Sequence, residues 1–120
     1  MVARQFWRDS GCKPQDIQTA FIYDHFTPFV FVQLEELGFC GRGEAKDFAT
    51  VERLSLGGEF PINTNGGLLG EAYIHGMNGI TEAVRQVRGT SHNQVADVEH
   101  VLVTSGTGVP TSGLILAPAG

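Results

Sequence analysis

The sequence is poor in positive charge and in long apolar runs, and each shortage excludes a class of protein. Only 8 of its 120 residues are lysine or arginine, and the net charge is −5. This balance excludes a protein that binds nucleic acid through a basic face. No apolar run approaches the roughly 20 residues of a membrane span, and residues 1–7 lack the apolar block of a signal peptide. We therefore expect a cytoplasmic protein with no membrane span and no nucleic-acid partner.

Cysteine is also scarce, and no metal-ligand spacing is present. Cys12 and Cys40 are isolated in the sequence, so we expect free thiols that fill space in a reducing compartment rather than catalytic nucleophiles. The polar residues near the C-terminal strands lack a metal-ligand pattern as well; these are His92, Asp97, Glu99 and His100. We expect no metal site and no covalently bound cofactor.

Glycine, in contrast, is abundant. The chain holds 16 glycines, nearly twice the usual share of about 7%. Five of them fall in the stretch Phe60–Gly79, together with three asparagines. Residues that tolerate positive φ are costly in conformational entropy, so a plain connection would not need this density. We expect a strand end, then a tight loop where the backbone approaches a ligand or another backbone, and then a helix.

The hydrophobic pattern predicts alternating helices and strands. We expect three main helices. The first covers residues 2–10 and the third covers residues 75–88. The second has Thr27 as its N-cap and Pro28 in its first position, and it is stopped by Gly38. We expect strands over residues 17–23, 98–104 and 113–116, and a further strand that ends at residues 60–62. A long excursion before that strand should hold one helical turn around residues 45–53. The helix after Thr27 is apolar nearly all round, which predicts burial on more than one side.

The helix over 75–88 is amphipathic. Its predicted inner stripe is Ile80, Ala83, Val84 and Val87, and its predicted solvated face is Glu82, Arg85, Gln86 and Arg88. This order of elements predicts an α/β fold with a mixed, mostly parallel sheet, helices packed on it and a final antiparallel hairpin. Sites in such sheets form at the carboxyl ends of strands. Residues 23–25, 63–71 and 105–108 all follow strands, so we expect them to converge on one site.

The tyrosines and histidines near these strand ends are candidates for proton transfer. Tyr23 and Tyr73 are the only tyrosines, and each is followed two positions later by a histidine, His25 or His75. A phenol is a natural proton donor and becomes a base where its surroundings stabilise phenolate. The alternative is that these four side chains are half-buried and satisfy backbone groups.

The polar and glycine-rich residues nearby are candidates for binding. Asn63, Asn65 and the amides of Gly66 and Gly67 could bind a carbonyl or an oxyanion, or could serve only as turn residues. The stretch 105–108 is rich in glycine, but no Gly-Lys-Ser/Thr follows and it leads into a strand. A phosphate-binding loop is therefore excluded.

Three motifs together resemble those of thiolases. Ile62–Gly67 followed by Ala72–Gly79 resembles Asn-x-x-Gly-Gly…Gly-His-Pro-x-Gly-x-x-Gly, and Tyr23-Asp24-His25-Phe26 resembles Asn-Glu-Ala-Phe or the His-Asp-Cys-Phe of sterol-carrier-type thiolases. The glycine-rich hairpin follows in the right order. The resemblance spans essentially the whole chain, residues 1–120, as one thiolase C-terminal-like domain. It implies a separate N-terminal half that carries the nucleophilic cysteine, and a five-stranded sheet, order 3-2-1-4-5, whose first, central strand is absent here.

The departures from the thiolase pattern imply a different reaction. Tyr73 stands at the place of the catalytic histidine and Tyr23 at that of the Asn or His of the oxyanion site. This pair is similar to that of the thiolase-like lipid-transfer-protein aldolases of bacterial steroid side-chain breakdown. The resemblance implies retro-aldol cleavage of a β-hydroxyacyl-CoA, with coenzyme A as part of the substrate. The alternatives are a thiolase-type acyltransferase half and a non-catalytic assembly module.

The same resemblance implies roles and partners. The implied acid/base residues are Tyr23 and Tyr73, with His25 and His75 beside them. The implied substrate-binding residues are Asn63, Asn65, Gly66, Gly67, Gly76, Ser105 and Gly106. The implied partners are the N-terminal half, a second copy in a homodimer and a small OB-fold, zinc-containing protein. Alone, we expect the chain to be inactive and to expose apolar surface.

Overall fold

The computed structural model describes residues 2–72, 74–106 and 112–120. Its elements along the chain are α1 (Val2–Ser10), the 3₁₀ helix η1 (Pro14–Asp16), β1 (Thr19–Phe21), α2 (Thr27–Glu36), α3 (Ala45–Phe48), α4 (Val51–Leu54), α5 (Gly67–Gly70), α6 (Met77–Arg88), β2 (Val101–Ser105) and β3 (Ser112–Leu116). Within these residues, every helix is too short or too polar to cross a bilayer. The predicted first helix is confirmed, and the excursion after α2 holds two helical turns rather than one.

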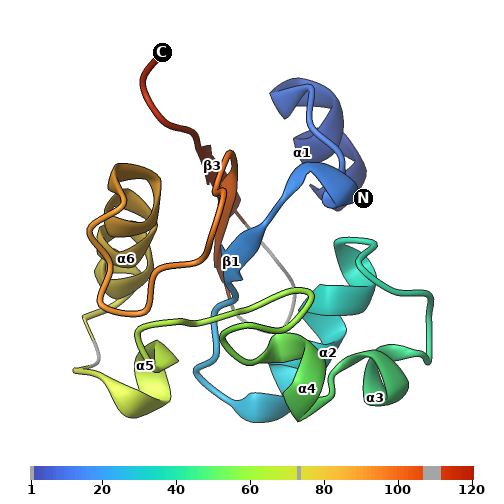
Figure 1. Cartoon of the computed structure of the whole chain (residues 1–120). Helices are drawn as coiled ribbons and strands as arrows, with labels where there is room; N and C mark the ends of the chain where they lie inside the picture. Colours follow the sequence, from blue (N-terminus) through green and yellow to red (C-terminus); the bar gives the residue numbers. More distant parts are fainter. Residues whose placement is uncertain (1, 73, 107–111) are drawn as a thin grey trace.

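The three strands form one mixed sheet in the order β1-β2-β3. β1 runs parallel to β2, with Ala20 opposite Leu102, and β3 runs antiparallel to β2, with Leu114 opposite Val103. Helix α6 covers one face of the sheet, and α1 and α2 lie on the other (Figure 1). The predicted α/β class and the predicted closing hairpin are confirmed.

The centre of the sheet differs from the expected order. β1 and β2 pair directly with each other along the whole of β1. A further strand therefore has no place between them, and the expectation that the missing strand is the central one is wrong.

The predicted strand end at 60–62 is reduced to a single parallel bridge between Ile62 and Ala20. Pro61 has no N–H to donate to a ladder, and its carbonyl accepts from the Thr19 hydroxyl at 2.7 Å. Beyond the bridge, the Asn63 side chain bonds the backbone of Ile22 in place of a strand. This also explains why β1 ends at Phe21 rather than at residue 23.

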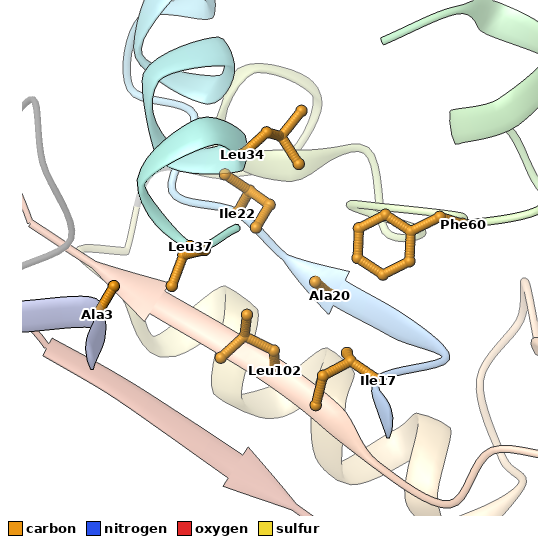
Figure 2. Close-up of a cluster of buried hydrophobic side chains, with 8 residues drawn as sticks. All are labelled: Ala3, Ile17, Ala20, Ile22, Leu34, Leu37, Phe60 and Leu102. Atoms are coloured by element: carbon orange, nitrogen blue, oxygen red, sulfur yellow. The ribbon is translucent and has the colours of Figure 1, made fainter. Parts of the chain in front are cut away.

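The larger core lies between the sheet and α2 (Figure 2). Ile22, Leu34 and Leu102 are completely buried there. On its outer face α2 leaves Phe31 38% and Val32 39% exposed, so within this chain the helix is buried on one side only, not on more than one. The helix also begins one residue earlier than predicted, because Phe26 rather than Thr27 is the N-cap.

The second core lies between the sheet and α6, where two residues were placed on the wrong face. Ala83 is buried as predicted, but Glu82 and Gln86 are buried too, at 5% and 2% exposure. The Glu82 carboxylate accepts from the Thr64 hydroxyl at 2.6 Å and the Ser91 hydroxyl at 2.5 Å. These neutral donors offset the cost of burying the charge. The polar loops on either side of α6 therefore supply the hydrogen-bond partners that allow Glu82 and Gln86 to be buried.

Candidate functional site

The carboxyl ends of β1 and β2 lie side by side, and a closed ring of hydrogen bonds joins them to α2. The Tyr23 N–H donates to Thr104 Oγ1 at 2.9 Å, and the Thr104 hydroxyl donates to Gln33 Oε1 at 2.7 Å. The ring closes where Gln33 Nε2 donates to the Tyr23 carbonyl at 2.7 Å. Thr104 and Gln33 are 1% and 2% exposed. The backbone of Tyr23 is therefore fixed from two elements at once.

The imidazole of His25 lies directly beside the phenol of Tyr23. Their ring centroids are 4.9 Å apart, and the other side of His25 stacks on Phe29 at 4.9 Å with an interplanar angle of 6°. His25 Nδ1 is buried and has no hydrogen-bond partner among the described residues. This buried nitrogen therefore has unused hydrogen-bonding capacity within the part of the chain that the structure describes.

The glycine loop of the thiolase-like motif docks on a buried carboxylate, that of Asp24. Oδ1 of Asp24 accepts from the Leu68 N–H at 2.8 Å. Gly66 and Gly67 both have positive φ, 98° and 67°, and a Cβ on Gly67 would fall inside the Asp24 carboxylate. The paired glycines are therefore required for this close approach. Asp24 lies in the stretch 23–25 that was expected to reach the site, but no role was predicted for its carboxylate.

The side chains of Asn63 and Asn65 bond the chain itself. Asn63 Oδ1 accepts from the Ile22 N–H at 2.8 Å and its Nδ2 donates to the Ile22 carbonyl at 3.0 Å. Asn65 Oδ1 accepts from the Gly67 N–H at 3.1 Å. These contacts are those of turn and strand-end residues, so substrate binding by the two asparagine amides stays a prediction.

A hollow of about 380 Å³ separates the start of α6 from the β2–β3 hairpin. His75 and Gly76 lie on one side of it and Ser105 on the other, and a Cβ on Gly76 would lie 3.8 Å from Ser105 Oγ. The rest of its lining is mainly apolar: Met77, Ile80, Val103, Thr104, Ser112, Gly113 and Leu114. Gly106, with φ 145°, follows directly after Ser105.

One part of the predicted convergence is seen, in the contact of Asp24 with the Gly67 loop; Ser105 lies near Gly76, which is outside the predicted stretch 63–71. Tyr73 and residues 107–111 lie outside the described residues, so the meeting of the two phenols stays a prediction. Among the described residues, no three His, Cys, Asp or Glu side chains come together as candidate metal ligands. Sequence reasoning missed Gln33 and Thr104, and the only signal was a glutamine in an otherwise apolar stretch of helix.

A mixed sheet covered by helices on both faces, with a glycine loop docked at the carboxyl end of its parallel strands, is the architecture expected of a thiolase C-terminal half. The family described as "Thiolase C-terminal domain-like" matches residues 2–116. The chain belongs to this family.

Two curated relatives make the comparison more specific. The chain is 71% identical to the 17-hydroxy-3-oxo-4-pregnene-20-carboxyl-CoA lyase of Mycobacterium tuberculosis and 67% identical to the steroid side-chain-cleaving aldolase of Thermomonospora curvata, over 116 residues in each case. Each match covers 97% of this chain and 30% of the relative. A solved structure of the Ltp2-ChsH2(DUF35) aldolase superposes with a TM-score of 0.91 at 67% identity, over 98% of this chain and 31% of that one. The chain therefore spans about 30% of the length of these relatives.

Proposed function

We propose that the chain is the C-terminal part of a thiolase-like aldolase that cleaves a C–C bond in a β-hydroxyacyl-CoA of the steroid side-chain type. The observation that carries this proposal is the identity of 71% and 67% to two proteins named as a lyase of such a CoA thioester and as a side-chain-cleaving aldolase. Tyr23 and Tyr73 stand where ordinary thiolases need other residues, which agrees with a reaction that uses no nucleophilic cysteine.

In this reaction Tyr23 and Tyr73 are the acid/base pair. One group removes the proton of the β-hydroxyl. The electron pair left on that oxygen forms the ketone C=O as the C–C bond breaks. The electrons of that bond pass to the α-carbon and give the enolate of the shorter acyl-CoA. The other group then protonates the α-carbon. Coenzyme A is part of the substrate, and the reaction needs no covalently bound cofactor.

The geometry around Tyr23 suits such a role. The hydrogen-bonded ring through Thr104 and Gln33 holds its backbone, and His25 beside its phenol can take or return a proton. We assign the thioester end of the substrate to the hollow between His75 and Ser105. There, dipoles from the glycine-rich ends of both elements can face the developing enolate oxygen.

Partners follow from the surfaces that the chain leaves open. Phe26 is 64% exposed, and on the outer face of α2 Phe31 and Val32 are 38% and 39% exposed. We propose that the N-terminal part of the protein covers this face, since the relatives are more than three times as long as the match. The solved neighbour is named for two components, which supports a second, separate component, and we propose that this component is the small OB-fold, zinc-containing protein that the thiolase resemblance implies. We also propose a homodimer and, because Cys12 and Cys40 are free thiols, a cytoplasmic location.

The test is an assay of the complete protein, with its partner, for release of a ketone and a shorter acyl-CoA. We expect Tyr23→Phe and Tyr73→Phe each to lower kcat by about 10²–10⁴-fold, the range for loss of a general acid or base. Thr90→Val, which removes a hydroxyl from the exposed loop after α6, should leave kcat unchanged. Full turnover in both tyrosine variants would refute the mechanism. Thiolysis that depends on an upstream cysteine would establish an acyltransferase instead, and a complex without turnover would indicate an assembly module.

A further inference from the structure

Asn78, near the start of α6, is 7% exposed, and all of its amide hydrogens and its carbonyl are used. Its Oδ1 accepts from the Ile74 N–H at 3.0 Å, and its Nδ2 donates to the Ala72 carbonyl at 2.6 Å. The second hydrogen of Nδ2 points to Glu71 Oε2, 3.1 Å away. One side chain therefore bonds the backbone on both sides of position 73.

The turn at His75 and Gly76 has a strained backbone that needs support from its surroundings. His75 has φ 22° and Gly76 φ 84°, and the Met77 N–H donates to the Ile74 carbonyl at 2.9 Å across them. A positive φ is costly for a residue with a side chain, of the order of 1–3 kcal/mol, and persists only where the surroundings impose it. Ile74 is bonded at its N–H by Asn78 and at its carbonyl by Met77, so these two restraints on the turn at His75 pass through Ile74.

A chain of polar contacts carries the same restraint to the glycine loop. Glu71 Oε2 accepts from Asn78 Nδ2 and also from Asn65 Nδ2, the latter at 2.6 Å. Asn65 in turn accepts from the Gly67 N–H in the loop that docks on Asp24. Hydrogen bonds to an ionised carboxylate are among the stronger ones in proteins. Asn78 thus joins the segment before α6 to the rest of the candidate site.

We propose that Asn78 is a positioning residue for the reaction. It fixes the backbone on either side of position 73 and the strained turn at His75, and so sets where the groups on this segment lie relative to Tyr23. The inference rests on the proposed function, because it matters for catalysis only if Tyr73 or His75 takes part. Asn78 itself touches no substrate.

Asparagine suits this place because it has one acceptor and two donors on one rigid plane. An aspartate of the same shape still accepts from the Ile74 N–H. It turns a second oxygen toward the Ala72 carbonyl and the Glu71 carboxylate, where repulsion replaces both bonds. Asn78→Asp therefore removes the hydrogen bonds to the Ala72 carbonyl and to Glu71 with little change in side-chain volume.

The experiment compares Asn78→Asp with Asn93→Asp in the complete protein with its partner. Asn93 Nδ2 also donates to a backbone carbonyl at 2.6 Å, that of Thr64, but on the loop at the other end of α6. For Asn78→Asp we expect kcat to fall by about 10²-fold, the effect of a misplacement near 1 Å, with a much smaller change in KM. We expect backbone amides of residues 71–77 to exchange at least about tenfold faster. Asn93→Asp should speed exchange around residue 64 and residues 90–95 rather than over 71–77, and should lower kcat far less than Asn78→Asp does.

A second variant tests the restraint by rescue. Adding Glu71→Gln to Asn78→Asp gives a side-chain amide that can donate to the new carboxylate, so part of kcat and part of the exchange protection should return. A wild-type kcat in Asn78→Asp, or unchanged exchange over residues 71–77, would overturn the proposal. If the unaltered protein shows no retro-aldol turnover, the proposed function fails, while the exchange comparison and its rescue still decide whether Asn78 fixes this segment.

Discussion

Replacing Thr104 by valine tests whether the hydrogen-bonded ring behind Tyr23 stabilises the site. Valine has nearly the same shape as threonine, so the change removes one hydroxyl and little volume. Two buried groups then lose their partner: the Tyr23 N–H, which donates to the hydroxyl at 2.9 Å, and Gln33 Oε1, which accepts from it at 2.7 Å. With Thr104 1% exposed and Gln33 2% exposed, water has little access to either group.

The magnitude follows from these two orphaned groups. A buried donor or acceptor left without a partner costs about 1–3 kcal/mol, so Thr104→Val should lower the free energy of unfolding by about 2–6 kcal/mol. That is a large part of the 5–15 kcal/mol that stabilises a typical domain. Thr104→Ser keeps the hydroxyl and loses one methyl group, and should cost about 1 kcal/mol.

Urea unfolding of the two variants against the unaltered protein measures the difference. The serine variant should lie close to the unaltered protein and the valine variant well below it. If Thr104→Val costs no more than Thr104→Ser, the ring contributes no net stability. Tyr23 would then have to be held by packing alone.

Two further changes probe the glycine loop and the half-buried thiol of Cys40. Gly67→Ala should destabilise by about 2–4 kcal/mol, because alanine is strained at φ 67° and its Cβ would overlap the Asp24 carboxylate; Gly70→Ala, which meets nothing within 4 Å, is the control and should be neutral in the same unfolding assay. Burial, and next the carboxylates of Glu35 and Glu44, raise the pKa of the Cys40 thiol above its ordinary value, so its alkylation at pH 8 should be slow and should rise only at higher pH than for an ordinary cysteine. Glu35→Gln should move this rise to lower pH, and an unchanged profile would show that the carboxylate has no part in it.

Apolar runs predicted the layers of this fold well. The run over 17–23 contains β1 and that over 98–104 contains all of β2 except Ser105, and the pattern of Ala83 and its neighbours located α6 and its inner face. Local patterns of this kind report which residues are buried, because a strand or helix with an apolar face has few other ways to remove that face from water.

The same patterns could not predict which polar residues are buried. Glu82 and Gln86 were assigned to solvent, yet Thr64 bonds both side chains and Ser91 bonds Glu82, from loops that are 18 and 9 residues away from Glu82 in sequence. The role of Gln33 was missed for the same reason, because its partner Thr104 is distant in sequence. A polar side chain is buried only where distant groups satisfy it, and these partners come together only in the folded chain. The spacing of residues within one helix does not predict these distant hydrogen-bond partners.

The carboxyl end of β1 owes its shape to side chains rather than to a longer sheet. After Phe21, the next backbone groups are bonded by Asn63 at Ile22 and by Thr104 and Gln33 at Tyr23. A strand in their place would have continued the ladder and closed this edge of the sheet with regular backbone. Because side chains satisfy the backbone instead, the chain can turn away at Asp24 and receive the glycine loop there. The residues that end β1 are therefore also those that open the edge on which the candidate site is built.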